Sequence, residues 1–178
     1  SLTVGMLCGV GLSVLFALLF GYFVLILKAN NMLVSLALNT LGSGGTVFML
    51  YALTGDRGNS TSLASLQFPT VNIPFIQDIP VLGKILSGHN VLTYVALLSV
   101  PVMFIILMKT PLGLRIRAVG ENEGAAESLG TSPVKTRFIA LIIAGVFAGF
   151  AGMYMSMGYV SAFTRDMISG RGYIAIAA

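Results

Sequence analysis

The sequence predicts an all-α protein, a polytopic membrane helical bundle with about four spans. Only 9% of its 178 residues are charged and 56% are hydrophobic, and the mean hydropathy is +0.94. A soluble domain carries about 25% charged residues. The apolar runs lack the alternation of barrel strands, and within lipid only helices or closed barrels satisfy the backbone. A soluble enzyme with a charged surface is therefore excluded.

Four runs without a charged residue define the expected spans. A helix rises about 1.5 Å per residue, so about 20 apolar residues cross a hydrocarbon core about 30 Å thick. The expected spans are Leu2–Leu27, Met32–Thr54, Val91–Met108 and Phe138–Val160. Apolar stretches reach almost to both ends, so we expect residues 1–178 to form a single membrane domain that is incomplete at both ends.

The connecting segments predict the orientation. The 109–137 segment holds eight of the sixteen charged residues, and five of these eight are basic. In the 55–90 segment, two acidic and two basic residues cancel. Because the cytoplasmic loops of membrane proteins carry the excess of Lys and Arg, we expect 109–137 to be a cytoplasmic loop and 55–90 an extracytoplasmic loop.

Local signals divide the cytoplasmic loop. The third span should end before Pro111, since the residue that precedes a proline avoids helical dihedrals. Asn122 can cap a short helix from Glu123 to Leu129, and Gly130 can end it. Pro133 suits the first position of a helix, so we expect the fourth helix to begin there, after a Thr-Ser cap.

Small residues recur at every fourth position in the first and fourth spans. Helix backbones approach closely along such faces, which matters where lipid removes the usual hydrophobic drive. Two interpretations remain open, a sliding interface between helices and static packing. The residues are Gly5, Gly9, Ser13, Ala17 and Gly21 in the first span and Ala140, Ala144, Ala148, Gly152 and Ser156 in the fourth, with Gly145 and Gly149 alongside.

The second span carries a stripe of uncharged polar side chains within about 120° of helix arc. Polar groups at this depth are costly, so we consider two roles for them: a wall of a solute pathway, or hydrogen bonds between helices. The glycines that follow Asn39, at positions 42, 44 and 45, would also permit an irregular backbone, which is tolerated where it is buried or lines a cavity. The candidate pathway residues are Asn31, Ser35, Asn39 and Ser43, with Thr46 beyond them.

The usual signatures of catalysis and of phosphate or metal binding are missing from this sequence. Gly83 and Lys84 are followed by Ile85, so there is no phosphate-binding loop. His89 has no Cys or His neighbour at metal-ligand spacing. The span interiors hold no charged side chain, which disfavours a proton relay or a voltage sensor. We therefore expect no catalytic residue, metal site, cofactor or nucleic-acid partner.

Three stretches of the chain resemble a known family. They are LGLRIRAVGENEGAAESLGTSPVKTR (Leu112 to Arg137), the terminal SGRGYIAIAA, and ANNMLVSLALN (Ala29 to Asn39). They resemble the permease subunits of bacterial ABC importers for simple sugars, nucleosides and branched-chain amino acids. The resemblance implies a multi-pass protein of the bacterial cytoplasmic (inner) membrane. The partners it implies are the lipid bilayer, a second permease subunit, cytoplasmic ABC ATPase subunits and an extracytoplasmic solute-binding protein.

In this family a short cytoplasmic helix couples the permease to the ATPase. Carried over residue by residue, the resemblance assigns ATPase coupling to Arg117, Ala118, Gly120, Glu121, Asn122, Ala125, Ala126, Glu127 and Gly130. The small residues Gly124, Ala125 and Ala126 would suit a groove on a partner, and the charges can set the register of docking. The sequence departs from the family pattern at Glu123, where proline often follows the Glu-Asn pair.

The sequence therefore predicts a transmembrane permease subunit of an ATP-driven importer for a small polar solute, a nucleoside or a simple sugar. It is not expected to be an enzyme, since ATP hydrolysis would occur on a partner subunit. The alternatives are a secondary carrier, a channel subunit, a structural membrane subunit, or a branched-chain amino-acid permease of the same family. The absence of charged residues within the spans disfavours a carrier, and the lack of a filter-like sequence disfavours a channel.

Overall fold

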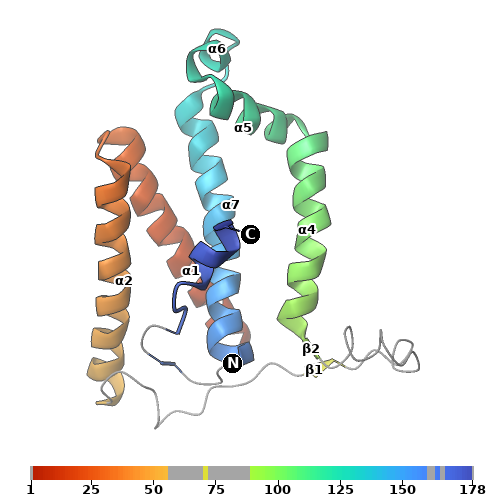
Figure 1. Ribbon diagram of the computed structural model, residues 1–178. Coiled ribbons are helices and arrows are strands. Elements are labelled where there is room, and N and C mark those ends of the chain that lie inside the picture. The colour runs from red at the N-terminus through yellow and green to blue at the C-terminus, as the bar shows by residue number, and fades with distance from the viewer. Residues whose placement is uncertain (1, 56–69, 72–88, 160–162, 165–166, 178) are drawn as a thin grey trace, which may run out of the picture.

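The computed structural model describes residues 2–55, 70–71, 89–159, 163–164 and 167–177 (Figure 1). Helix α1 (Leu2–Gly21) continues as a π-helical segment, η1 (Tyr22–Ile26). The remaining elements are α2 (Asn31–Thr54), β1 (Thr70–Val71), β2 (His89–Asn90), α4 (Val91–Lys109), α5 (Pro111–Glu121), α6 (Glu123–Ser128), α7 (Pro133–Met153), η2 (Tyr154–Tyr159) and α8 (Arg171–Ala177).

The all-α class is confirmed, with four helices that are long and apolar enough to cross a membrane. They cover Thr3–Ile26, Asn31–Thr54, Val91–Lys109 and Pro133–Tyr159. These helices match the spans expected from the charge-free runs, except that the fourth begins earlier, at the predicted helix start. Among the described residues the only strands are β1 and β2, which pair antiparallel over two residues each. The rest of the expected extracytoplasmic loop, 56–69 and 72–88, lies outside the described residues.

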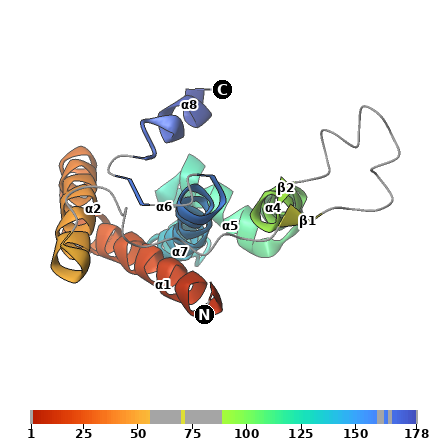
Figure 2. The ribbon, with the colours of Figure 1, turned by 90° about the horizontal axis from the view of Figure 1, so that it is seen from below.

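Helix α7 stands between α2 and α4, and α1 crosses it obliquely (Figures 1 and 2). At one end of the bundle, α5 and α6 connect the end of α4 to the start of α7 (Figure 1). We call this the α6 end. The turn between η1 and α2 lies at the same end as α5 and α6, and so on the same side as the segment expected to be cytoplasmic.

Helices α1 and α7 pack antiparallel, with glycine at the points of closest approach. A Cβ atom added to Gly145 would lie 2.8 Å from Cβ of Ala17. A Cβ atom added to Gly21 would lie 2.8 Å from Cδ1 of Leu141. Carbon atoms do not pack at such distances, so the two helices can approach this closely only because these positions carry no side chain.

Each step of four residues along α1 is matched by a step of four residues back along α7. The facing pairs are Gly5 with Met157, Gly9 with Met153, Ser13 with Gly149, Ala17 with Gly145, and Gly21 with Leu141. Towards both ends of the contact, glycines of α1 accommodate large side chains, which come from α7 and, at Met157, from η2. In the middle of the contact the glycines are on α7 instead: Gly149 leaves room for Ser13, and Gly145 leaves room for Ala17.

The face of α7 in this contact is not the expected alanine stripe. Gly145 and Gly149 are buried, whereas Ala144 and Ala148 are exposed. A Cβ atom added to Gly152, on the alanine stripe, would meet no atom within 4 Å. The two stripes are offset by one residue, about 100° around the helix, and both repeat every four residues. The spacing alone therefore could not select between them.

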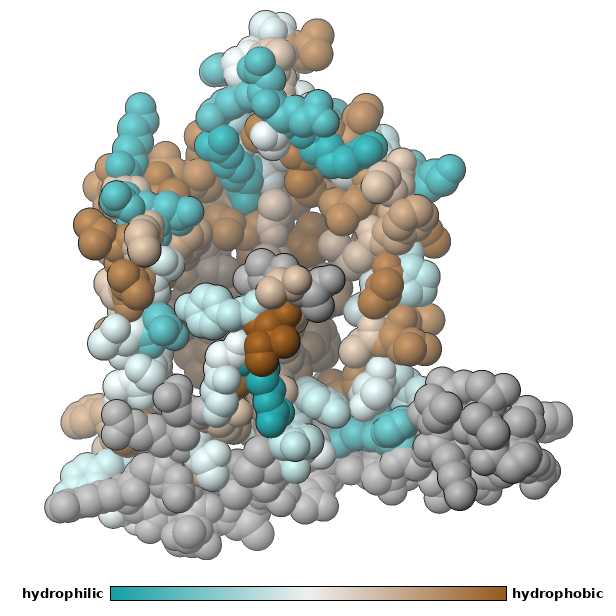
Figure 3. Space-filling view, viewed as in Figure 1, coloured by the Kyte–Doolittle hydropathy of each residue, from teal (hydrophilic) through white to brown (hydrophobic). Residues whose placement is uncertain are grey.

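Few side chains are buried in the described part of the chain. The buried apolar residues are Leu92, Val119, Ala126 and Met153. Many large apolar side chains on the spans are exposed; Leu7 and Leu53, for example, are 75% and 80% exposed. Figure 3 shows hydrophobic atoms along the middle of the long helices and hydrophilic atoms gathered at the α6 end. This distribution suits surfaces that lipid or further helices cover.

The backbone of α2 differs from expectation. The helix runs regularly through Gly42–Gly45, so these glycines create no irregular backbone. The irregular helical segments are η1 and η2, which directly follow α1 and α7. No glycine or proline cluster in the sequence marked these two segments as irregular.

Candidate functional site

Helix α5, which the sequence patterns did not predict, begins immediately after α4. The hydroxyl of Thr110 accepts a hydrogen bond from the N–H of Gly113 (3.3 Å), and Pro111 takes the first helical position. We had interpreted Pro111 only as the end of a span, although the same residue also suits a helix start. A Cβ atom added to Gly113 would overlap the carbonyl oxygens of Ile106 and Leu107. Helix α5 therefore packs directly against the end of α4.

Asn122 ends α5 and, as predicted, caps α6. Its N–H donates to the carbonyl of Ala118 (3.0 Å), and its side-chain oxygen accepts from the N–H of Ala125 (3.1 Å). Helix α6 ends at Ser128, and Gly130 follows with φ of +80°, in the left-handed region that favours glycine. The predicted short helix with its cap and its glycine stop is confirmed, and it ends one residue early.

Helix α6 is held against the start of α7 by an ion pair. The guanidinium of Arg137 donates to the carboxylate of Glu123 through two hydrogen bonds, Nη2 to Oε2 at 2.8 Å and Nη1 to Oε1 at 3.3 Å. Both side chains are about half exposed, 43% and 50%, so the pair contributes about 1 kcal/mol at most. Its main effect is geometric, because a two-point contact sets the orientation of α6 relative to α7.

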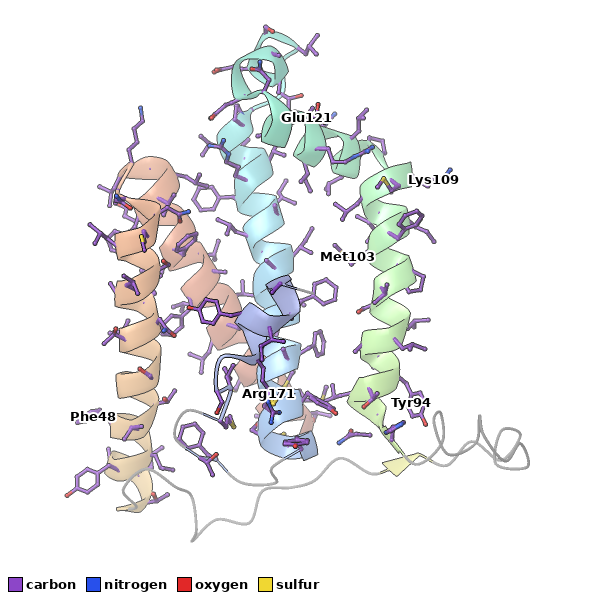
Figure 4. All side chains as sticks on the ribbon, viewed as in Figure 1. Phe48, Tyr94, Met103, Lys109, Glu121 and Arg171 are labelled. Carbon is purple, nitrogen blue, oxygen red and sulfur yellow. The ribbon has the colours of Figure 1, made fainter. Side chains whose placement is uncertain are left out.

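Eight of the nine predicted coupling residues are exposed and available to a partner. These eight are Arg117, Ala118, Gly120, Glu121, Asn122, Ala125, Glu127 and Gly130. Figure 4 shows Glu121 at the far end of α5 from Lys109, which ends α4. The ninth residue, Ala126, is only 3% exposed. The expectation that both alanines face a partner groove is therefore wrong for Ala126, which packs inside the chain.

Sequence reasoning missed one surface residue of this segment. Leu129, which follows α6, is 85% exposed. An exposed leucine among polar neighbours offers an apolar contact to a partner. The pattern had placed it inside the short helix, where its exposure could not be judged without the helix orientation.

The four predicted pathway residues on α2 are all exposed in the described chain. The hydroxyls bond within their own helix: Ser35 donates to the carbonyl of Met32 (2.9 Å), and Ser43 donates to that of Thr40 (3.2 Å). Asn39, two turns into α2, makes no hydrogen bond with any described residue. Its amide therefore remains available both to donate and to accept.

A cavity of about 650 Å³ lies between α2 and the segment around the start of α8. It brings together two of the predicted pathway residues, Asn39 and Ser43, whereas Asn31 and Ser35 do not line it. The facing side includes Phe163, Thr164, Ser169 and Tyr173, and none of the described residues that line the cavity is charged. Amide, hydroxyl and aromatic groups together suit a neutral polar solute.

The facing side of this cavity was not predicted as a site. Its only signal in the sequence was the terminal SGRGYIAIAA stretch, which we had used for the family resemblance alone. Within that stretch, the guanidinium of Arg171 lies 4.8 Å from the ring centroid of Tyr159, and its Nη1 lies 3.6 Å from Sδ of Met155. These contacts hold the start of α8 against η2, in front of α7 in Figure 4.

Comparison with known proteins decides the family. The profile of the family described as branched-chain amino acid transport system / permease component matches residues 1–178. The chain belongs to this permease family. With four helices of spanning length, the permease is a multi-pass protein of the cytoplasmic (inner) membrane.

Three curated relatives are similar in sequence to this permease over most of its length. It is 35% identical to the guanosine ABC transporter permease protein of Bacillus subtilis, over 97% of this chain and 54% of the relative. It is 34% identical to the putative glucose ABC transporter permease protein of Haloferax volcanii, over 98% of this chain and 51% of the relative. It is 30% identical to a nucleoside ABC transporter permease protein of Lactococcus lactis, over 85% of this chain and 47% of the relative. The chain thus spans about half the length of these relatives, and no solved structure gives a significant match.

Proposed function

We propose that this permease is a subunit of an ATP-driven importer for a small polar solute, a nucleoside or a simple sugar. The relatives' names, which refer to guanosine, glucose and nucleoside transporters, support this class of solute. Among the residues that the structure describes, those lining the cavity beside α2 are uncharged, which also favours a neutral solute over an ion. In this proposal the partners are a second permease subunit, an extracytoplasmic solute-binding protein and cytoplasmic ABC ATPases. The ATPases hydrolyse the ATP.

The observation that carries the proposal is the continuous packing from α4 through α5 and α6 to α7. Helix α5 packs on α4 at Gly113, and α6 is bonded to α7 through Glu123 and Arg137. A partner that displaces α6 must therefore displace the ends of two spans. We assign the contact with the ATPase to the eight exposed coupling residues, with Ala126 supporting α6 from inside.

The solute would pass along the polar stripe of α2. Asn39 and Ser43 line the cavity, and we assign them the direct contacts. Ser35 and Asn31 lie about one and two turns nearer the α6 end of the same helix, so we assign them to the cytoplasmic continuation of the pathway. Among the four, Asn39 carries the largest expected contribution, because its amide makes no hydrogen bond with the described residues.

Purification and uptake by the full-length permease test this proposal. The protein is expressed with the products of its neighbouring genes, purified through a tag, and reconstituted in proteoliposomes with its binding protein. We expect an ATPase subunit to copurify. We also expect uptake of labelled guanosine or glucose only when ATP is present on the side of the membrane that carries the ATPase subunits. Uptake that proceeds without ATP, or a permease that purifies without any ATPase, would contradict the proposal and favour a secondary carrier.

A further inference from the structure

A groove with basic residues lies between α5 and the start of α7, away from the cavity beside α2. Its volume is about 690 Å³. Arg115 from α5 and Lys135 from α7 supply its positive charge. Leu112, Ile116 and Ile139 supply an apolar lining from the same two helices. None of these five residues belongs to the predicted coupling set, although Gly130 of that set also lines the groove.

The two cations are free to bind an external anion. Arg115 and Lys135 are both exposed. In the part of the chain that the structure describes, neither forms a salt bridge, and the nearby carboxylate of Glu123 is already paired with Arg137. Two unpaired cations that line one groove repel each other, and an anion bound between them removes that repulsion.

Neutral donors line the same groove. Thr131 and Ser132 are part of its lining, and their hydroxyls make no hydrogen bond with the described residues. Pro133 has no N–H, so the N–H groups without a partner within α7, a helix of 21 residues, are those of Val134 and Lys135, at the positive end of its dipole. The groove therefore offers cationic and neutral donors together, and none of the described residues that line it is acidic.

The groove lies where the spans meet the polar end of the bundle. The third span ends at Lys109, next to Thr110 in the groove, and the fourth begins at Pro133. Figure 3 shows the hydrophilic surface of the α6 end meeting the hydrophobic surface of the helices at this level. In a bilayer this is the level at which a phosphate headgroup joins its acyl chains.

We propose that this groove binds an anionic phospholipid. The headgroup phosphate would lie between Arg115 and Lys135 and accept hydrogen bonds from Thr131 and Ser132. An acyl chain would lie along Ile139, which is about one turn further into the span than Lys135. A bound lipid joins α5 to α7 beside the ion pair that orients α6. The inference depends on the membrane position of the chain and is independent of the transported solute and of ATP.

Lipid binding to the full-length permease in detergent tests this inference. Native mass spectrometry gives the apparent affinity for phosphatidylglycerol and for phosphatidylcholine, measured separately. We expect tighter binding of phosphatidylglycerol. Arg115→Gln and Lys135→Gln should each weaken that binding about fivefold, and the double variant about 25-fold, because each cation near an anionic headgroup contributes about that factor. Lys28→Gln is the matched control, since Lys28 belongs to the turn between η1 and α2, at the same end of the bundle, and does not line the groove.

Several outcomes would overturn the inference. The first is that the affinity for phosphatidylglycerol is the same in the double variant as in the unmodified protein. The second is that Lys28→Gln lowers this affinity as much as the groove variants do. The third is that phosphatidylglycerol and phosphatidylcholine bind equally well. If soluble glycerol phosphate displaces the lipid, the groove is a site for free phosphate. If the variants lose the copurifying ATPase while lipid binding is unchanged, the groove faces a partner protein. If the double variant does not purify, the two single variants and the charge-conserving Arg115→Lys decide the question.

Discussion

The hydroxyl of Ser13 donates a hydrogen bond of 2.8 Å to the carbonyl oxygen of Gly145, and so joins α1 to α7 across their contact. The bond is possible because Gly145 and Gly149 leave room for the α1 backbone. Interhelical hydrogen bonds in membranes contribute about 0.6 to 2 kcal/mol. The Ser13 bond therefore adds a modest directional term to a contact that packing dominates.

Removing this hydroxyl should destabilise the helix pair. We expect Ser13→Ala to lower the free energy of unfolding of the full-length permease by about 1 kcal/mol, measured by denaturant titration in micelles. Ser99→Ala is the matched control, because Ser99 donates only to the carbonyl of Ala96 in its own helix (2.7 Å). Equal losses in the two variants would show that the interhelical bond contributes nothing.

Adding a methyl group to α7 should have opposite effects on its two faces. Gly145→Ala places a Cβ atom 2.8 Å from that of Ala17 and should cost about 1 to 3 kcal/mol. Gly152→Ala meets no atom within 4 Å and should be neutral, or stabilising by up to about 1 kcal/mol through helix propensity. Thermal unfolding of the two variants gives the comparison, and a tolerated Gly145→Ala would refute the packing described for α1 and α7.

Bulky substitutions in α6 should separate coupling from folding. Ala125 is exposed, so Ala125→Trp should leave folded yield intact and abolish substrate-stimulated ATPase activity of the assembled importer. Ala126 is buried, so Ala126→Trp should lower the folded yield itself. Glu127→Lys should have a smaller effect on stimulation, because charges at the rim of an interface mainly change encounter rates. Normal stimulation in Ala125→Trp would contradict the assignment of coupling to α6.

The cavity beside α2 predicts a difference between two polar residues of one stripe. Asn39→Ala should lower the uptake rate at limiting solute about fivefold, since one hydrogen bond to the solute is lost. Ser35→Ala should change uptake little, because Ser35 does not line the cavity and its hydroxyl bonds to Met32. Uptake of the labelled solute in proteoliposomes measures both variants. An unaffected Asn39→Ala would leave helix packing as the role of the stripe.

The predicted orientation can be tested by labelling cysteines. In a Cys8→Ser background, Ser128→Cys should react with an impermeant maleimide only from the cytoplasmic side, since 109–137 carries the excess of basic residues. Ser60→Cys, in the 55–90 segment, should react only from the opposite side. Labelling of both cysteines in intact cells without permeabilisation would refute the orientation.

The spans and α6 were predictable because local chemistry determines them. Charge-free runs located the four long helices, and Asn122 and Gly130 marked the ends of the short one. Helix α5 was missed because a proline can both end one helix and begin the next, and we considered only the first role for Pro111. A sequence pattern that allows both roles at Thr110-Pro111 would have found α5.

Other features depend on contacts between distant segments and could not be predicted. The burial of Ala126 follows from how α6 folds back on the chain, and two adjacent alanines give no sign of which one faces inward. The cavity beside Asn39 needs residues of the 163–173 segment, more than 120 positions away in the sequence. Both findings require the three-dimensional arrangement of the helices.

The alternation of glycines and large side chains along α1 and α7 has a mechanical consequence. A shift by one helical turn would bring Met153 opposite Ser13 and Gly145 opposite Gly21, which would lose the Leu141 side chain that fills it, so the pair has a single register. Helices α1 and α7 should therefore translate and tilt together as one rigid pair. Rotation of α2 relative to this pair must then occur at the turn between η1 and α2, where Lys28 has φ of +51°. If the cavity on α2 opens and closes during transport, this turn is the joint about which it does so.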